Sequence, residues 1–291
     1  MMKKLWALLL AFGLLGAACG SSEETTEAGA DDTAESTDDT GDTTDSCDTL
    51  SLKTEGVLTV ATGEPVFEPW MVDDDPTNGQ GFESAVVYAL AGELGVDTVE
   101  WVRTGFDEAI APGEKEYDFN IQQYSITAER DEVVDFSDGY YQTEQAVIGA
   151  TDSPIASATT LADLKTTRLG AAIGTTSLDY AETVIAPDTE VQVFDDNAAA
   201  KAAFDAGQID GIVFDLPTAY YITAVEIPEA SILGVLPVDG DPEELGMLFE
   251  DGSPLVPCVN EALAALDAAG TLDELEDEWL NQGGSIPTLG S

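Results

Sequence analysis

Residues 168–217 read RLGAAIGTTSLDYAETVIAPDTEVQVFDDNAAAKAAFDAGQIDGIVFDLP, and in them short apolar runs alternate with helical stretches. The strand-like runs are 168–173, 190–194 and 210–214, and the helical stretches are 177–185, 197–206 and, continuing past the quoted end, 216–224. Strands that alternate with helices favour parallel sheets with helices on both faces. The stretch therefore predicts an α/β fold.

The residues on either side of this stretch predict a second lobe. Before it, strand-like runs at 57–61, 98–102 and 119–122 accompany a helix at 82–94, and the extended stretch 145–150 and a loop at 151–160 separate the two series. After it, a short strand ends at Phe249, and helices follow at 255–268 and 272–280. We expect lobe 1 to comprise 47–146 and 246–291, and lobe 2 to comprise 147–245.

Composition excludes several classes of function. The chain has 291 residues, of which 9 are Lys or Arg and 58 are Asp or Glu, so its net charge is 9 − 58 = −49. Nucleic acid is excluded as a partner, because phosphate contacts need clustered cations. So large a negative charge destabilises the compact state by self-repulsion, which salt screens. The charge is therefore typical of a protein in salty surroundings. The chain has no histidine, which excludes Ser-His-Asp and Cys-His catalysis, and its three cysteines are too few for a metal cluster. We expect no metal and no cofactor.

Residues 1–19 resemble a lipoprotein export signal. Lys3 and Lys4 precede an apolar run at 5–15, and small residues lead to Cys19. We expect Cys19 to be lipidated, so that only a lipid anchor reaches the membrane; the alternative is ordinary secretion with Cys19 removed or free. Residues 20–46 hold ten acids and no base, which is typical of a disordered tether. The protein is therefore expected outside the cytoplasm, lipid-anchored at the cell surface or in the periplasm.

The two other cysteines are Cys47 and Cys258. An exported chain meets an oxidising compartment, so we predict that they form a disulfide. The bond would close a loop of more than 200 residues and, in the chain-entropy model, stabilise the fold by up to ~5 kcal/mol. The alternative is two buried free thiols.

Arg130 is one of only three arginines in the chain. Its guanidinium is a planar fork that matches a carboxylate, and its place between two strand-like runs indicates a ligand-binding role. The alternative is an ion pair with one of the many neighbouring acids.

Two further segments predict polar groups at the ends of strands. The turn Gly174-Thr175-Thr176-Ser177 lies between a strand and a helix, where free backbone N–H groups and a hydroxyl form an anion site. A simply capped helix is the alternative. Asp215 ends another strand directly before a Pro-containing helix start, so it is either a group facing a cleft or a helix N-cap.

An Arg fork, amides at the start of a helix and an Asp are what an α-amino acid requires, because its carboxylate and ammonium must both be paired when water is removed. Phe67 and Phe106 would then flank the ligand side chain, although core packing is the usual role of a Phe.

The order and spacing of several motifs resemble those of amino-acid-binding extracellular solute-binding proteins of ABC importers, solute-binding family 3. The resemblance covers residues 54–281 and implies the type II periplasmic-binding fold, which is two Rossmann-like lobes joined by hinge strands. The motifs are EPVFEPW at 64–70, GFE at 81–83, SITAER at 125–130 with VDFS at 134–137, GTT at 174–176 and DLP at 215–217.

The resemblance also implies roles for single residues. The ligand carboxylate would bind Arg130 and the region of Thr175 and Thr176, the ligand ends would be held by Ser125 and Asp215, and the side chain would lie between Phe67 and Phe106. Gln123 stands where the family usually has a small residue, so its side chain is expected to intrude on the pocket. Glu64 matches a position that in similar proteins often carries an acid reaching a basic or hydrogen-bonding side chain; a solvated loop Glu is the alternative. We expect a polar or cationic amino acid, with arginine or lysine first and glutamine second.

The function expected from these features is that of a monomeric binding protein, not an enzyme, that closes its lobes over an amino acid and presents it to an ABC permease complex. Two alternatives remain at this point. One is a periplasmic dehydratase on the same scaffold, with Glu64 or Glu68 as its acid. The other is a sensor that reports its ligand to a receptor.

Overall fold

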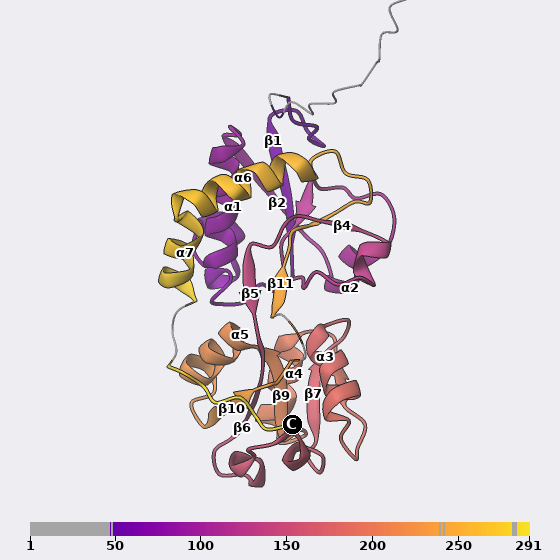
Figure 1. The fold of residues 1–291 in the computed structure, drawn as a ribbon, viewed down its shortest axis with the longest axis vertical. Coiled ribbons are helices and arrows are strands. Elements are labelled where there is room, and N and C mark those ends of the chain that lie inside the picture. Colours follow the sequence, from indigo (N-terminus) through magenta and orange to yellow (C-terminus); the bar gives the residue numbers. More distant parts are fainter. Residues whose placement is uncertain (1–46, 48, 239, 241, 281–283) are drawn as a thin grey trace, which may run out of the picture. The chain divides into compact units, whose positions relative to one another are not determined.

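Two five-stranded sheets are the framework of the described residues, which in this computed structural model are 47, 49–238, 240, 242–280 and 284–291 (Figure 1). The export signal and the acidic tether expected at 1–46 lie outside these residues. All of the described residues belong to one compact unit. In the described ranges, we find no helix that combines the length and the apolar character needed to cross a bilayer.

The first sheet belongs to lobe 1 and has the strand order β2-β1-β3-β12-β4. Its strands are β1 (Val57–Thr62), β2 (Thr98–Arg103), β3 (Phe119–Asn120), β4 (Asp135–Phe136) and β12 (Leu248–Phe249). β1 runs parallel to β2 and β3, whereas β12 is antiparallel to β3 and β4. Residues 58–62 of β1 are all buried, as in a strand covered on both faces.

The second sheet belongs to lobe 2 and has the strand order β10-β6-β9-β7-β8. Its strands are β6 (Gln145–Ala150), β7 (Leu169–Ala172), β8 (Gln192–Phe194), β9 (Gly211–Asp215) and β10 (Ala230–Val235). β7 is parallel to β8 and β9, and β6 is antiparallel to β9 and β10.

Both sheets are therefore mixed, which corrects the expectation of parallel sheets. In lobe 2, only β7, β8 and β9, which are joined to one another through helices, pair in parallel. β6 comes directly from lobe 1, without the crossover helix that a parallel neighbour requires, and so it enters in the opposite direction.

The helices cover these sheets. Lobe 1 has α1 (Phe82–Glu93), α2 (Phe106–Ile110), α6 (Val256–Ala269) and α7 (Thr271–Trp279), and α1 packs against both α6 and α7. Lobe 2 has α3 (Thr176–Tyr180), α4 (Asn197–Asp205) and α5 (Leu216–Tyr221); α3 and α5 each continue as a π-helical turn, at Ala181–Ile185 and Ile222–Glu226. Asp196 caps α4 by accepting a hydrogen bond from the Ala199 N–H at 2.7 Å.

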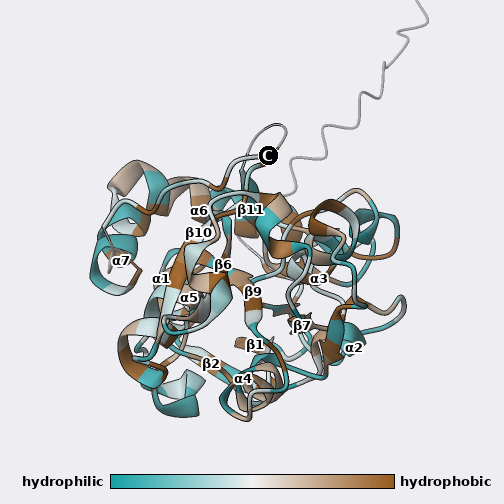
Figure 2. Cartoon of the chain, turned by 90° about the horizontal axis from the view of Figure 1, so that it is seen from below, coloured by the Kyte–Doolittle hydropathy of each residue, from teal (hydrophilic) through white to brown (hydrophobic). Residues whose placement is uncertain are grey.

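Each lobe has an apolar core. In lobe 1, side chains of β1, β3, α1 and α6 pack together, among them Val60, Phe119 and Leu263. In lobe 2, one cluster lies on each side of the sheet, around Leu169 and around Phe214. Figure 2 shows apolar residues, in brown, along β6 and β9, whereas α7 is largely hydrophilic. The two lobes therefore have separate cores.

Two short strands lie where the chain crosses between the lobes. β5 (Tyr141–Thr143) pairs antiparallel with β11 (Glu243–Leu245) and leads into β6, so lobe 2 already begins at Gln145 rather than at 147. The C-terminal tail also differs from the expectation, which placed everything after 246 in lobe 1. Thr288 and Gly290 form β-bridges with Val235 and Thr160 of lobe 2. Leu289, between them, is buried in the lobe 2 core.

A disulfide joins Cys47 to Cys258 across a sequence separation of 211 residues. Cys258 lies on α6 within the lobe 1 core, and Cys47 packs against that core. The bond therefore ties the start of the described chain to its C-terminal helices.

Candidate functional site

A cavity of about 270 Å³ lies between the lobes. Lobe 1 contributes the loop after β1, the start of α2 and the segment after β3, and lobe 2 contributes the ends of β7 and β9 and the starts of α3 and α4. All residues for which a ligand-binding role is expected line this cavity: Glu64, Phe67, Phe106, Gln123, Ser125, Arg130, Thr175, Thr176 and Asp215.

Arg130 joins the two lobes across this cavity. Its side chain is 8% exposed, and its Nη1 donates to the Ser125 carbonyl at 2.6 Å while its Nη2 donates to the Gly174 carbonyl of lobe 2 at 2.9 Å. The guanidinium carbon lies 5.5 Å from the centre of the Phe106 ring. Burial lowers the pKa of Arg130 from its usual value. Among the ion pairs of the described residues none involves Arg130, which disfavours the alternative of a neighbouring acid.

Phe106 begins α2 and stacks on Tyr124, with ring centres 4.5 Å apart. Tyr124 is fully buried and donates to the Gln122 side-chain carbonyl at 3.1 Å. Phe106 therefore offers a supported aromatic face to the cavity and to Arg130.

The turn at 174–176 is close to lobe 1. Gly174 has φ +71°, and a Cβ there would collide with the carboxylate of Asp107, so the turn needs glycine. The Thr175 hydroxyl caps α3 by accepting from the Leu178 N–H at 3.1 Å, and it donates to the Ala172 carbonyl at 2.8 Å. Thr175 therefore acts as the helix cap that the alternative expected, while Thr176 lines the cavity and its hydroxyl donates to Glu243 at 2.8 Å.

Asp215 ends β9, and its side chain makes no capping hydrogen bond to α5. Its Oδ1 accepts from the Gln145 Nε2 at 2.6 Å, and the residue lines the cavity. Burial first and then the charge of Glu243 raise the pKa of Asp215 to about 7. A cation bound beside it would favour the ionised form.

Glu83 is a buried carboxylate that supports Gln123. It is fully buried on α1 and accepts hydrogen bonds from the Tyr140 hydroxyl at 2.6 Å and from the Gln123 N–H at 2.7 Å, as well as from the Gln123 side-chain amide. Burial raises the pKa of Glu83 to about 7. Gln123 has φ +50°, and these bonds hold its side chain toward α1 while the residue still lines the cavity.

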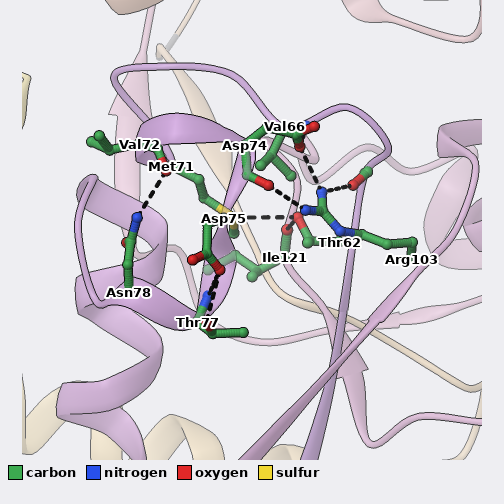
Figure 3. A network of polar contacts seen from close by, with 11 residues as sticks. Thr62, Val66, Met71, Val72, Asp74, Asp75, Thr77, Asn78, Arg103 and Ile121 are labelled. Carbon is green, nitrogen blue, oxygen red and sulfur yellow. Dashed lines mark hydrogen bonds and ion pairs between the residues drawn. The ribbon is translucent and has the colours of Figure 1, made fainter.

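Glu64 and Phe67 lie on the loop after β1, which a network of polar contacts holds in place (Figure 3). Arg103 donates to the carbonyls of Gly63 and Asp74, both at 2.6 Å, and its guanidinium lies 3.1 Å from the Asp74 carboxylate. That carboxylate also accepts from the Val66 N–H at 3.0 Å. Glu64 itself is exposed at the rim, and Phe67 is half-buried.

Three polar residues of this region, Glu83, Gln145 and Glu243, were not foreseen as site residues. Glu83 carries a signal, because it is a charge within a helix whose neighbours are mostly apolar. Gln145 begins an apolar strand, which is a weaker signal. Glu243 carries none, because it is one acid among 58.

Residues 58–282 match the bacterial extracellular solute-binding proteins, family 3. The chain belongs to this family.

Relatives within family 3 cover most of the chain. The ABC transporter arginine-binding protein 1 of Escherichia coli (strain K12) is 29% identical over 212 residues, which is 69% of this chain and 82% of that protein. The L-cystine-binding protein TcyJ of the same strain is 27% identical over 234 residues, which is 78% of this chain and 84% of that protein.

A solved structure of an ancestral arginine-binding protein bound to glutamine is 31% identical to this family 3 chain. It matches with a TM-score of 0.67 over 78% of this chain and 98% of the other. The fold is accordingly the type II periplasmic-binding fold, with two α/β lobes and hinge strands.

Proposed function

We propose that this family 3 protein captures a polar or cationic L-amino acid outside the cytoplasm and delivers it to an ABC permease complex. The observation that carries the proposal is one cavity between two lobes that is lined by Arg130 at one place and by Asp215 at another. An α-amino acid has one charge of each sign, and both must be paired in a closed site. Relatives named for arginine and cystine binding support the same class of ligand.

In this proposal Arg130, with the backbone N–H groups of the turn at Thr175 and Thr176 beside it, receives the ligand carboxylate. Arg130 has five N–H donors, and its two bonds to backbone carbonyls leave others for a ligand. Asp215 and Ser125 receive the ammonium. Phe67 and Phe106 flank the side chain, and Gln123 lines the cavity with its own side chain held toward α1.

The side-chain part of the cavity is acidic, which favours a cationic ligand. Glu64, Asp195 and Asp196 line it, and Arg130 supplies the basic side chain of the lining. Asp196 uses one acceptor site in capping α4, so Glu64 and Asp195 are the carboxylates with the greater capacity for a ligand. We therefore place arginine or lysine first and glutamine second.

Closure of the lobes is the proposed capture step. Contacts that exist only in the closed form shift the open and closed populations, and the permease recognises the closed form. Two interlobe contacts support this idea. Trp70 Nε1 donates to the Thr218 hydroxyl at 2.8 Å, and Arg130 donates to the Gly174 carbonyl.

Calorimetry on the chain from residue 20 onward, titrated with the twenty L-amino acids, tests the proposal. We expect saturable binding of arginine or lysine, and weaker or no binding of agmatine, which lacks the carboxylate. A folded protein that binds none of the twenty would contradict the proposal.

We also propose that Cys19 carries a lipid and that residues 20–46 tether a monomeric binding domain to the membrane. The apolar run before Cys19 and the ten acids after it support this arrangement. Metabolic labelling with a fatty acid should mark the wild type and not Cys19→Ser. Equal labelling of the two would contradict it.

A further inference from the structure

Glu243 lies on β11, between the lobes, and contacts one hydroxyl from each of them. Its Oε2 accepts from the Ser125 hydroxyl of lobe 1 at 2.6 Å and from the Thr176 hydroxyl of lobe 2 at 2.8 Å. Ser125 and Thr176 both line the cavity, whereas Glu243 does not. The carboxylate therefore stands outside the cavity wall and holds two groups that belong to the wall.

The direction of these hydrogen bonds follows from counting protons. A carboxylate only accepts, and a hydroxyl has one proton and two lone pairs. The protons of Ser125 and Thr176 are thus both directed to Glu243. The Ser125 and Thr176 oxygens also lie 3.4 Å apart, which is too long to compete with the bonds to Glu243. Toward the cavity these hydroxyls present lone pairs, which accept hydrogen bonds.

Gln145 connects the Glu243 carboxylate to that of Asp215. The side chain of Gln145 is fully buried, and its amide oxygen accepts from the Ser177 hydroxyl. Its Nε2 therefore faces the acids, donating to Asp215 at 2.6 Å and lying 3.4 Å from Glu243. Two carboxylates and two acceptor hydroxyls are joined on this side of the cavity, which suits a group with several N–H donors.

We propose that Glu243 is a positioning residue that fixes the Ser125 and Thr176 hydroxyls as hydrogen-bond acceptors for the α-ammonium group of the ligand, and that it does so across the two lobes. The inference rests on the proposed amino-acid binding. It also changes the role expected for the Thr176 side chain, which the resemblance had assigned to the carboxylate. Since one hydroxyl comes from each lobe, the acceptor pair is complete only when the lobes are closed.

Glu243→Gln tests this positioning role, with Glu244→Gln as the matched control. Glu244 is the next residue of β11, is exposed, and accepts from the Gln142 amide at 3.0 Å. Both hydroxyls donate to the same carboxylate oxygen, Oε2, and the neutral amide oxygen that Glu243→Gln places there is a weaker acceptor, so the two protons are held less firmly away from the cavity. The probes are L-arginine, L-lysine and L-glutamine, each compared with its analogue in which hydrogen replaces the α-ammonium.

Glu243→Gln should weaken binding of the amino acid by about tenfold or more and change binding of its desamino analogue by less than about twofold, since one good hydrogen bond to a charged group corresponds to a change of that order. Glu244→Gln should change neither. A merely structural role of Glu243 would weaken both ligands equally, and that result would overturn the inference, as would equal affinities in the two variants.

Thr176→Val keeps the shape of the side chain and removes the hydroxyl oxygen, so it is a second, independent test of that oxygen as an acceptor for the α-ammonium group. It should also reduce affinity for the amino acid more than for the desamino analogue, and an equal loss for both would overturn the inference. Failure of all three amino acids to bind the wild type would instead contradict the proposed function, and the inference with it. Binding to the wild type that Glu243→Gln leaves unchanged would contradict the inference only.

Discussion

Arg130 is the residue on which ligand affinity should depend most. Its buried guanidinium faces the cavity and has no carboxylate partner among the ion pairs of the described chain. Arg130→Ala would leave a bound ligand carboxylate unpaired in a closed site. We expect a loss of about 3 kcal/mol, which is roughly a hundredfold in Kd, measured by calorimetry.

Arg168→Ala is the control for this prediction. It makes the same change of charge, but Arg168 pairs with Asp210 on the surface of lobe 2, at 2.5 Å, and is not part of the cavity lining. Its Kd should stay within about twofold of the wild type, because exposed ion pairs contribute little. Similar affinities in the two variants would remove Arg130 from the site.

Glu83 should make stability depend on pH. Its pKa is about 7 in the folded protein against 4.5 for an ordinary Glu, because it is buried on α1. The folded state therefore holds the proton more tightly than the unfolded state. The stabilisation is complete below the unfolded pKa and is lost as the pH rises through the folded pKa.

Glu83 should lower the free energy of unfolding of the wild type by roughly 2 to 3 kcal/mol between about pH 5 and about pH 8, since one pKa unit corresponds to about 1.4 kcal/mol. Glu83→Gln should lack this part of the pH dependence. Urea unfolding at both pH values measures it. Glu93→Gln, an exposed position at the end of the same helix, is the control. If the free energy of unfolding depended on pH in the same way in the wild type and in Glu83→Gln, burial would not be what raises the pKa of this carboxyl.

Single residues differ in how far the sequence reveals them. Arg130 is conspicuous because cations are rare in this chain, and Asp215 because it ends an apolar strand before Pro217. Glu243 is not conspicuous, since its significance comes from contacts with Ser125 and Thr176, which are 118 and 67 positions away in the chain. Burial and long-range contacts of that kind leave no local pattern in a sequence rich in acids.

Among the elements, long apolar runs were the easiest to predict. The helix expected at 82–94 is α1 (Phe82–Glu93), and the strand expected at 145–150 is β6. β5, β11 and β10 were not predicted. β5 and β11 have three residues each, and their pairing with one another depends on how the chain crosses between lobes rather than on residue pattern.

The link between Cys47 and α6 should contribute strongly to stability. It spans 211 residues, and the chain-entropy model gives about 5 kcal/mol for a loop of this length. The double variant Cys47→Ser, Cys258→Ser should lose that amount in urea unfolding. Its ligand affinity should be unchanged, because neither cysteine lines the cavity.

Reductant provides the control for the disulfide. It should destabilise the wild type by the same amount and leave the double variant unaffected. A double variant as stable as the oxidised wild type would mean that packing around α6, and not the cross-link, determines stability here.

The charge of the whole molecule limits the conditions in which it stays folded. From Cys47 onward the chain has 48 acids and 7 bases, which follows from 58 − 10 and 9 − 2 after the first 46 residues are subtracted. The ion pairs found among the described residues use only Lys53, Arg103, Arg168 and Lys201. Most surface acids are therefore without a basic partner in the folded state, and their repulsion favours expansion.

Salt should consequently stabilise this protein. Raising NaCl from about 0.1 M to about 1 M shortens the screening length from about 10 Å to about 3 Å, which weakens repulsion between surface acids. We expect Tm to rise by several degrees, measured by calorimetry. The variant Glu182→Gln, Glu190→Gln, Glu229→Gln removes three exposed charges from lobe 2 and should show a higher Tm at low salt and a smaller rise with NaCl. If the variant and the wild type respond to NaCl equally, salt acts through apolar surface or ion binding, and charge repulsion is not what limits the stability of the fold.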